Sequence, residues 1–228
     1  MAVAVLYVVG TPIGNLSDIT YRAVDTLRAS ELVLCEDTRQ TRKLLNHYDI
    51  QVPVSAFHAH TGDERTSALV ERVAGLDACS LVTDAGTPGL SDPGAIMVQA
   101  CIDSGVDVRP IPGVSAFTAL VSVSGPLGRT VVFDGFLSPR AGRRRRRLEE
   151  LRDRGEAFVL YESPHRLVKT LEALDEVYPR ARVLVGREIT KAFEEFLRGE
   201  PGELADKFSN RGRIRGELTI LVRPPEKR

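Results

Sequence analysis

The stretch LVTDAGTPGLSDPG, residues 81–94, begins as an apolar run and then becomes a polar loop rich in glycine, proline and aspartate. Glycine lets a ligand approach the backbone and proline limits the freedom of the loop, so this composition is typical of a ligand-binding segment. Similar polar segments follow the other apolar runs of the first half: GTPIGN (10–15), EDTR (36–39), HAHTGDE (58–64) and PGVSA (112–116). If the apolar runs are parallel strands, these segments meet at the sheet edge where α/β proteins bind ligands.

The residues of these loops also restrict the chemistry of the ligand. The phosphate-binding patterns GxxxxGK[ST] and GxGxxG are absent, and Pro12 removes a backbone donor that a pyrophosphate would need. Carboxylates at Glu36, Asp37, Asp84 and Asp92 would repel phosphates. A cationic, donor-rich ligand such as S-adenosylmethionine fits this composition better. The alternative is that the acids and glycines serve only as helix caps and tight turns.

The elements that would position these loops alternate along the first half of the chain. The apolar runs VAVLYVV, ELVLC, VPVSAF, CSLVT and VDVRPI are short and nearly continuous, which is typical of strands buried on both faces. Helices are expected at 18–29, 37–48, 62–75 and 93–104, with Asp18 as an N-cap and Gly105 after the last helix. This alternation predicts a mostly parallel sheet with helices on both faces.

The second half is expected to form another α/β domain after the Ser/Gly/Pro-rich segment SVSGPLGR. Strands are predicted at 130–136, 156–161, 182–188, 193–198 and 214–222, and helices at 143–154, 164–177 and 201–209. We therefore expect an N-terminal domain over 1–123, which carries the glycine- and proline-rich cofactor loops, and an Arg-rich C-terminal domain over 124–228 on the substrate side.

Charge is divided unevenly between the halves. Residues 1–125 carry 8 basic and 14 acidic side chains, whereas residues 126–228 carry 23 and 17. The basic second half, with five consecutive arginines at 143–147, indicates a surface that faces an anionic partner such as RNA. The alternative is a solvated helix in which Glu149 and Glu150 pair with arginines one turn away. Five consecutive arginines point all around a helix, however, so these acids alone cannot neutralise them.

Other features exclude several classes of protein. The 228 residues contain no apolar run near the ~18 that a membrane span needs, and the N-terminus has no signal-peptide pattern. The three cysteines lie in apolar segments without metal-ligand spacing, so we expect reduced core residues in a cytoplasmic protein. His58 and His60 lack further ligand spacing, and no metal site is expected.

Seven ordered motifs carry a resemblance that covers residues 6–222: LYVVGTPIGNLSDIT, LCEDTRQTRKLL, VTDAGTPGLSDPG, PIPGVSA, YESPHR, GREITKAFEE and RGELTILV. Together they resemble the ribosomal RNA small subunit methyltransferase I family, the rRNA branch of the tetrapyrrole methylase superfamily. This resemblance implies a two-domain α/β fold in which each sheet, parallel or mixed, is flanked by helices, with S-adenosylmethionine in a cleft between the domains. It further implies a homodimer that 2′-O-methylates a cytidine ribose in the decoding region of 16S rRNA, within the small ribosomal subunit.

The resemblance also assigns residues to roles. The cofactor-binding positions are Thr11, Pro12, Asp84, Gly86, Thr87, Pro88, Ser115, Ala116, Tyr161 and Leu218. The expected RNA contacts are Arg143, Arg144, Arg145, Arg146, Arg147 and Arg166. The segment LSPRAGRRRRR departs from the family pattern, which mixes lysine, arginine and small residues, because all its basic residues are arginine.

Ribose methylation needs alignment of methyl, sulfur and 2′-oxygen and an acceptor for the hydroxyl proton. Lys191 is the leading candidate base, with Glu162 and Glu188 as further catalytic candidates at or near predicted strand ends. The alternative role of Lys191 is a phosphate contact or an ion pair with Glu188. Two other functions are open: a tetrapyrrole or other small-molecule methyltransferase, and a non-catalytic RNA-binding or assembly module.

Overall fold

A computed structural model describes residues 4–58 and 62–225 of the chain, which divides into two compact units, Met1–Ser115 and Ala116–Arg228. The expected domain boundary lies later, between residues 123 and 124. The division falls earlier because α5 (Ala116–Ser122), which the sequence patterns did not predict, packs within the second unit. Leu120 of α5 is fully buried, and a Cβ atom added to Gly186 would lie 2.8 Å from Leu120 Cδ1.

The first unit is built on a five-stranded sheet in the order β3-β2-β4-β1-β5, with every described pair parallel. Its strands are β1 (Val5–Val9), β2 (Leu32–Cys35), β3 (Val54–Ala56), β4 (Ala78–Leu81) and β5 (Asp107–Ile111). Because all five run in one direction, the loops that follow them leave the sheet at the same edge. The predicted parallel sheet is confirmed.

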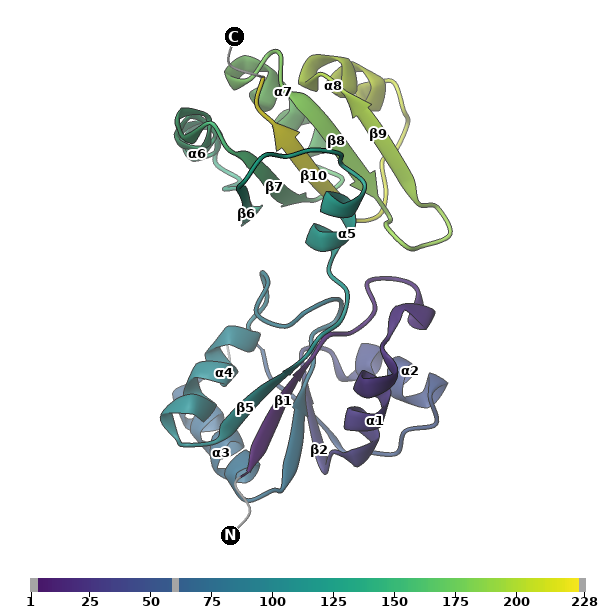
Figure 1. Ribbon diagram of the computed structural model, residues 1–228, viewed down its shortest axis with the longest axis vertical. Helices are drawn as coiled ribbons and strands as arrows, with labels where there is room; N and C mark the ends of the chain where they lie inside the picture. The colour runs from purple at the N-terminus through teal and green to yellow at the C-terminus, as the bar shows by residue number, and fades with distance from the viewer. Residues whose placement is uncertain (1–3, 59–61, 226–228) are drawn as a thin grey trace. The chain divides into compact units, whose positions relative to one another are not determined.

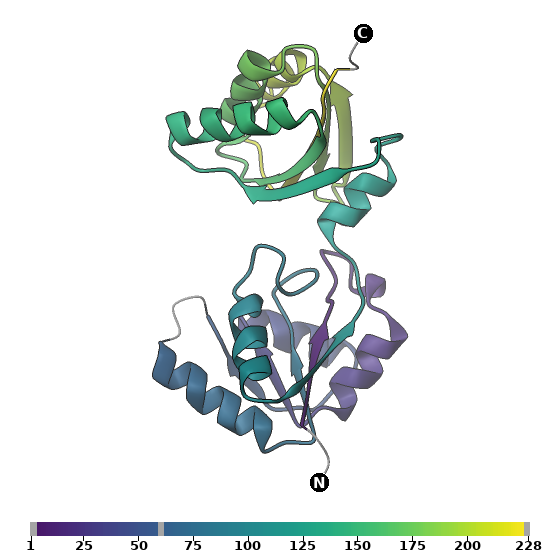
Figure 2. The same ribbon diagram turned by 60° about the vertical axis from the view of Figure 1, so that its left-hand side comes forward.

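Helices cover both faces of this sheet, as Figures 1 and 2 show. They are η1 (Leu16–Asp18), α1 (Tyr21–Ala29), α2 (Thr38–His47), α3 (Asp63–Ala74) and α4 (Gly94–Asp103). In β2, Leu32 and Leu34 belong to the apolar cluster formed with α3 and α4, whereas Val33 and Cys35 belong to the cluster formed with α1 and α2. The alternation of side chains along a strand therefore produces two cores, one on each face.

Strand β5 forms one edge of this sheet and carries Pro110. Asp107 N–H donates to Ala4 O at 3.0 Å, and Ile111 O accepts from Gly10 N–H at 3.0 Å. The backbone groups of residues 107 and 111 thus face β1. Because backbone direction alternates along a strand, the position of Pro110 faces the open edge.

The second unit contains a mixed sheet in the order β6-β7-β10-β8-β9. Its strands are β6 (Val131–Phe136), β7 (Ala157–Glu162), β8 (Arg182–Arg187), β9 (Glu195–Gly199) and β10 (Leu218–Arg223). Strands β6 and β7 are parallel, and the other neighbouring pairs are antiparallel. The register shifts between Phe133 and Gly135, which leaves Asp134 as an extra residue in β6.

Helices α6 (Ala141–Arg154), α7 (Leu167–Val177) and α8 (Pro201–Ser209) supply leucines and Phe208 to a single apolar cluster with one face of this sheet. Val183 and Val185 of β8 belong to that cluster. Gly186 lies on the opposite face by alternation, where α5 covers it. Each face of the second sheet is therefore partly covered by helix.

Several local expectations need correction. Helix α1 is capped by Thr20, whose hydroxyl accepts from Ala23 N–H at 3.1 Å, rather than by Asp18, which lies in the preceding 3₁₀ turn. The last strand begins at Leu218 instead of residue 214, because Gly216 adopts a φ of +96°. Gly105 follows α4 with a positive φ, as predicted. Cys35, Cys79 and Cys101 are free and buried, and burial raises their thiol pKa values, that of Cys79 to about 12.

Candidate functional site

The loop after β4 is the centre of the sheet edge at which the first unit's loops meet. Thr11 and Gly86 exchange two backbone hydrogen bonds, of 2.9 and 3.1 Å. The Thr87 hydroxyl donates to Val114 O at 3.2 Å in the loop after β5, and Asp37 N–H donates to Asp84 Oδ1 at 2.9 Å. The loops after β1, β2, β4 and β5 are therefore fastened to one another through residues 84–87.

Glycine is needed where these loops approach most closely. A Cβ atom on Gly10 would lie 2.7 Å from Gly113 Cα, so the loops after β1 and β5 cross backbone against backbone. Gly86 is buried with a φ of +86°, and its Cβ atom would lie 3.3 Å from Ile13 Cγ2. These positions explain the glycine content of the segments that the sequence singled out.

The proposed cofactor residues of this unit differ in what they can offer a ligand. Thr11 is buried, and its hydroxyl lies 3.2 Å from Thr83 O and 3.3 Å from Gly86 O, so it fastens the loops. Pro12 and Pro88 are buried beside it, Ser115 is 5% exposed, and Asp84 is exposed. Asp84 is therefore the group among these that presents a charge at the surface.

Three carboxylates of this edge influence one another. Burial and the nearby charges of Asp84 and Asp92 raise the pKa of Glu36, and His58 opposes them. A cation would offset this repulsion, which fits the sulfonium and ammonium groups of S-adenosylmethionine. Asp92 also has a local role, because its carboxylate accepts from Gly89 N–H at 2.8 Å and from Gly94 N–H at 2.7 Å. His60 lies outside the described residues.

Asp37 belongs to a different local arrangement. Hydrogen bonds from the side chain and backbone of Arg39 lower its pKa to about 2, and the Asp37 carboxylate caps α2. Its role in the fold is therefore that of an N-cap, as the alternative interpretation of these acids allows.

The remaining proposed cofactor residues lie in the second unit. Tyr161 is the next-to-last residue of β7 and belongs to an aromatic cluster, with its ring centroid 5.0 Å from that of Phe133 and 5.7 Å from that of Phe136. Burial raises the pKa of Tyr161. Leu218 is 3% exposed, its side chain packs in the core, and it pairs with Glu162 of β7 and Arg187 of β8. Ala116 is the first residue of α5 and is half-buried.

Lys191 lies in a strained turn after β8. Its Nζ lies 3.0 Å from Glu188 Oε1 and 3.1 Å from Glu217 Oε2. Glu188 and Thr190 have positive φ angles of 51° and 69°, and a Cβ atom on Gly216 would lie 2.5 Å from Glu188 Cδ. Strain of this kind persists only where the surrounding structure enforces it, and it clusters at functional sites.

The pKa values of Lys191 and Glu188 are shifted in the direction opposite to that expected for a general base. Burial lowers the pKa of Lys191, but hydrogen bonds to Glu188 and Glu217 outweigh it, so the net pKa is raised. Burial raises the pKa of Glu188, but hydrogen bonds from Glu217 N–H and Lys191 outweigh that effect, and its net pKa is lowered. A lysine base at neutral pH needs a lowered pKa, so in this arrangement Lys191 is an ammonium ion.

Glu162, the third catalytic candidate, is buried and hydrogen-bonded within the second unit. Its side chain is fully buried, with Oε2 accepting from the Thr170 hydroxyl at 2.6 Å and Oε1 from Ser163 N–H at 2.8 Å. Arg166, an expected RNA contact, lies 3.3 Å from the same carboxylate and donates to Leu137 O at 2.6 Å. Both residues thus join the start of α7 to the sheet.

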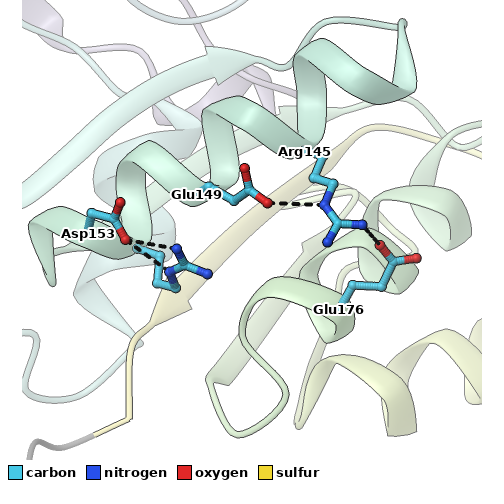
Figure 3. Close-up of polar contacts among 5 residues, drawn as sticks. Arg145, Glu149, Asp153 and Glu176 are labelled. Carbon is cyan, nitrogen blue, oxygen red and sulfur yellow. Dashed lines mark hydrogen bonds and ion pairs between the residues drawn. The ribbon is translucent and has the colours of Figure 1, made fainter.

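The arginine run of α6 is largely engaged within the protein, contrary to the expectation that nearby acids cannot neutralise it. Figure 3 shows Arg145 between Glu149 and Glu176, at 3.1 Å from each. Arg146 lies 3.4 Å from Glu150. The expectation counted acids on the same helix alone, whereas Glu176 comes from α7.

Two further arginines of the run are less exposed to solvent than Arg145 and Arg146. Arg147 pairs with Asp134, the extra residue of β6, and lies 3.0 Å from Glu150; these bonds raise its pKa. Arg144 is 8% exposed. Within the described chain, Arg143 is the one member of the run that is exposed and has no recorded ion pair.

The chain is thus an α/β protein with two sheets covered by helices. At one edge of the first sheet, hydrogen-bonded loops approach one another closely at glycines. Known proteins share this architecture. Residues 5–205 match the tetrapyrrole (corrin/porphyrin) methylases. A solved cobalt precorrin-4 methyltransferase superposes with a TM-score of 0.72 at 20% identity, covering 96% of this chain and 95% of that one. A uroporphyrin-III C-methyltransferase from Thermus thermophilus, complexed with S-adenosyl homocysteine, superposes with a TM-score of 0.64 at 20% identity over 95% and 96% of the chains.

One relative is much closer in sequence. The ribosomal RNA small subunit methyltransferase I of Borrelia garinii subsp. bavariensis is 47% identical over 218 residues, or 95% of this chain and 97% of the relative. The chain therefore belongs to the tetrapyrrole methylase family and, within it, to the ribosomal RNA small subunit methyltransferase I group. It is a methyltransferase, and the expected α/β fold is confirmed. Among the described residues, no helix is long and apolar enough to cross a membrane.

Proposed function

We propose that the chain uses S-adenosylmethionine to methylate the 2′-oxygen of a cytidine ribose in the decoding region of 16S rRNA. The observation that carries the rRNA substrate is the 47% identity to a relative whose name states that substrate, over nearly the full length of both chains. The small-molecule methyltransferases share the fold at only 20% identity, so they give little support to a tetrapyrrole substrate.

S-Adenosylmethionine supplies an electrophilic methyl group. Toward it, the first unit offers the exposed Asp84 carboxylate and the glycine-permitted backbone around Gly86, in a region where repulsion raises the pKa of Glu36. Thr87 and Pro88 hold that backbone in place. The acidic character of this region and its fixed backbone both suit a cationic ligand.

The chain's part in the reaction is chiefly alignment. Lys191 is protonated, Glu188 has a lowered pKa and both Glu162 oxygens accept hydrogen bonds, so none of these candidates is poised as a strong base. The proton that the 2′-hydroxyl loses on methylation therefore passes to solvent water. We infer that Lys191 acts as a cation that fixes Glu188 and Glu217, and so sets the shape of the strained turn. Positioning of reactants alone can supply much of the rate of a transfer whose leaving group is already good.

The decisive experiment is transfer of a labelled methyl group from S-adenosylmethionine to naked 16S rRNA and to small ribosomal subunits, followed by nucleoside mapping. We expect label on one 2′-O-methylcytidine in the decoding region. Label on a base, on another nucleotide or on a tetrapyrrole alone would overturn the proposal. Homodimer formation and a cytoplasmic location belong to the same proposal, and light scattering of the purified protein tests the dimer.

A further inference from the structure

A groove in the second unit lies beside the strained turn of Lys191. It has a volume of about 450 Å³ and is lined by Arg187, Glu188, Phe193, Arg211, Arg213 and Arg215, among others. We call it the Arg213 groove. Its lining carries four arginines against one glutamate, so it favours an anionic occupant.

The arginines of the groove fall into two pairs with different tasks. Arg211 donates two hydrogen bonds of 2.7 Å to Glu195, and Arg187 donates to the same carboxylate at 3.2 Å. Arg213 and Arg215 are exposed, and within residues 4–58 and 62–225 neither has a recorded ion pair. The first pair is bound to the fold, whereas the second is available to a phosphate.

An aromatic ring stands next to these two arginines. Phe193 is 73% exposed and lies in the turn between β8 and β9. Glu188 and Thr190 of the same turn have positive φ angles. Thr190 N–H donates to Glu194 Oε2 at 2.6 Å, which braces the turn from its other side. An exposed aromatic ring beside unpaired cations is the combination that proteins use to bind single-stranded nucleic acids, with bases stacked on the ring and phosphates on arginine.

We propose that the Arg213 groove binds an unpaired segment of the substrate RNA, with phosphates on Arg213 and Arg215 and a base against Phe193. The inference rests on the proposed rRNA substrate and deepens it by placing RNA on a different surface from the arginine run of α6. Glu188 lines the groove and also pairs with Lys191, so RNA held there would lie directly against the strained turn.

The test compares two double variants of the full chain with equal changes in charge. Arg213→Gln with Arg215→Gln removes the available pair in the groove. Arg129→Gln with Arg180→Gln removes two other exposed arginines of the same unit that do not line the groove. Affinity for a 16S rRNA fragment that spans the decoding region is measured across a salt series, and circular dichroism checks the fold.

We expect the groove variant to bind the fragment more weakly and to lower the log–log salt slope by about 0.7 to 1.4 units, since each single-strand phosphate contact contributes about 0.7. The control variant should keep nearly the wild-type slope. Phe193→Leu should weaken binding roughly 5- to 100-fold, the range of one lost base stack, with the slope unchanged. Affinity for S-adenosylmethionine should not change in any of them.

Failure of the inference is distinct from failure of the proposed function. If the wild-type protein methylates the rRNA while the groove variant and its control give coincident salt series, the groove is not the RNA surface. If Phe193→Leu alters nothing, the stacking part is wrong. A wild-type protein that neither binds nor methylates the rRNA removes the proposed function and, with it, the inference.

Discussion

The two units build their candidate sites from different materials. In the first unit, the candidate site is formed mainly by the backbone. Glycines allow the loops to cross, and hydrogen bonds between the loops fix residues 84–87. In the second unit, ion pairs between charged side chains form the candidate site. They are the pair of Lys191 with Glu188, the pairs of α6 and the arginines around Glu195. A site made from backbone is visible in sequence as unusual loop composition, whereas a site made from ion pairs depends on which charges the fold brings together.

The same contrast exists within the second unit, between α6 and the Arg213 groove. Both are rich in arginine, but the α6 side chains meet acids from β6, from α7 and from α6 itself. Arg213 and Arg215 have no recorded ion pair among the described residues, whereas Glu195 and Glu217 are paired with Arg187, Arg211 and Lys191. Arginine content alone therefore does not locate an anion-binding surface; the balance of local charge does.

The largest effect is expected for the backbone site of the first unit. Gly86→Val should weaken S-adenosylmethionine binding about 100-fold or more, because φ strain of ~1–3 kcal/mol adds to close contacts with Ile13 and Val114. Gly89→Val is the matched control, since Gly89 has a φ of +90° but nothing within 4 Å of its Cβ position. Calorimetry measures both affinities. Equal affinities in the two variants would show that close approach at Gly86 is irrelevant to the cofactor.

The next effect tests the charged turn of the second unit. Lys191→Met should reduce single-turnover methyl transfer by roughly 10²-fold, the cost of misplacing reactants by about 1 Å. Lys191→Arg keeps the cation between Glu188 and Glu217 and should retain most of the rate. If Lys191→Arg is as slow as Lys191→Met and both lose the rise of rate with pH that deprotonation of a base produces, Lys191 is a general base.

A smaller effect is expected on stability at α6. Arg147→Gln leaves the Asp134 carboxylate, which is 12% exposed, without its main cation. We expect a loss of about 1–2 kcal/mol in urea unfolding, less than for a fully buried pair because the Arg147 side chain is 33% exposed. Arg143→Gln, four residues earlier on the same helix, should stay within about 0.5 kcal/mol of wild type. Equal losses in both variants would contradict the distinction between them.

The smallest effect concerns Glu36. Because its folded pKa is raised, the folded protein binds this proton more tightly than the unfolded chain, so stability falls as the pH rises above 4.5, its ordinary value, toward the folded pKa. Glu36→Gln should remove this part of the pH dependence, which thermal unfolding at several pH values measures. It should also weaken S-adenosylmethionine binding about two- to fivefold, the range of a half-exposed ion pair. Tighter binding in this variant would contradict a cationic ligand at the acidic edge.

Much of the fold followed from sequence because its signals are local. The helix predicted at 201–209 matches α8, in which Pro201 lies in the first turn and Glu203 reaches back to Glu200 N–H at 3.2 Å. The α5 helix was missed because it follows PGVS and is only seven residues long. Its stability comes from Leu120 packing under Gly186, a contact far away in sequence.

The candidate site was predicted less evenly. The loop at 84–94 was found from its glycines and prolines, and its hydrogen bonds explain them. Lys191 and Arg147 form ion pairs with Glu217 and Asp134, which lie 26 and 13 residues away in sequence. Arg213 and Arg215 carried one available signal, the segment RGRIRG with no acid inside it. That signal was outweighed by the longer arginine run.

Pro110 affects whether another strand can pair with the outer edge of β5. Its nitrogen faces the open edge of β5 and has no hydrogen to donate, so a strand laid along this edge would lose a ladder bond at that point. Natural sheets use proline in this way to discourage edge-to-edge aggregation. A second copy of the chain would lose this bond if it extended the sheet through β5, so the outer edge of β5 discourages further growth of the parallel sheet.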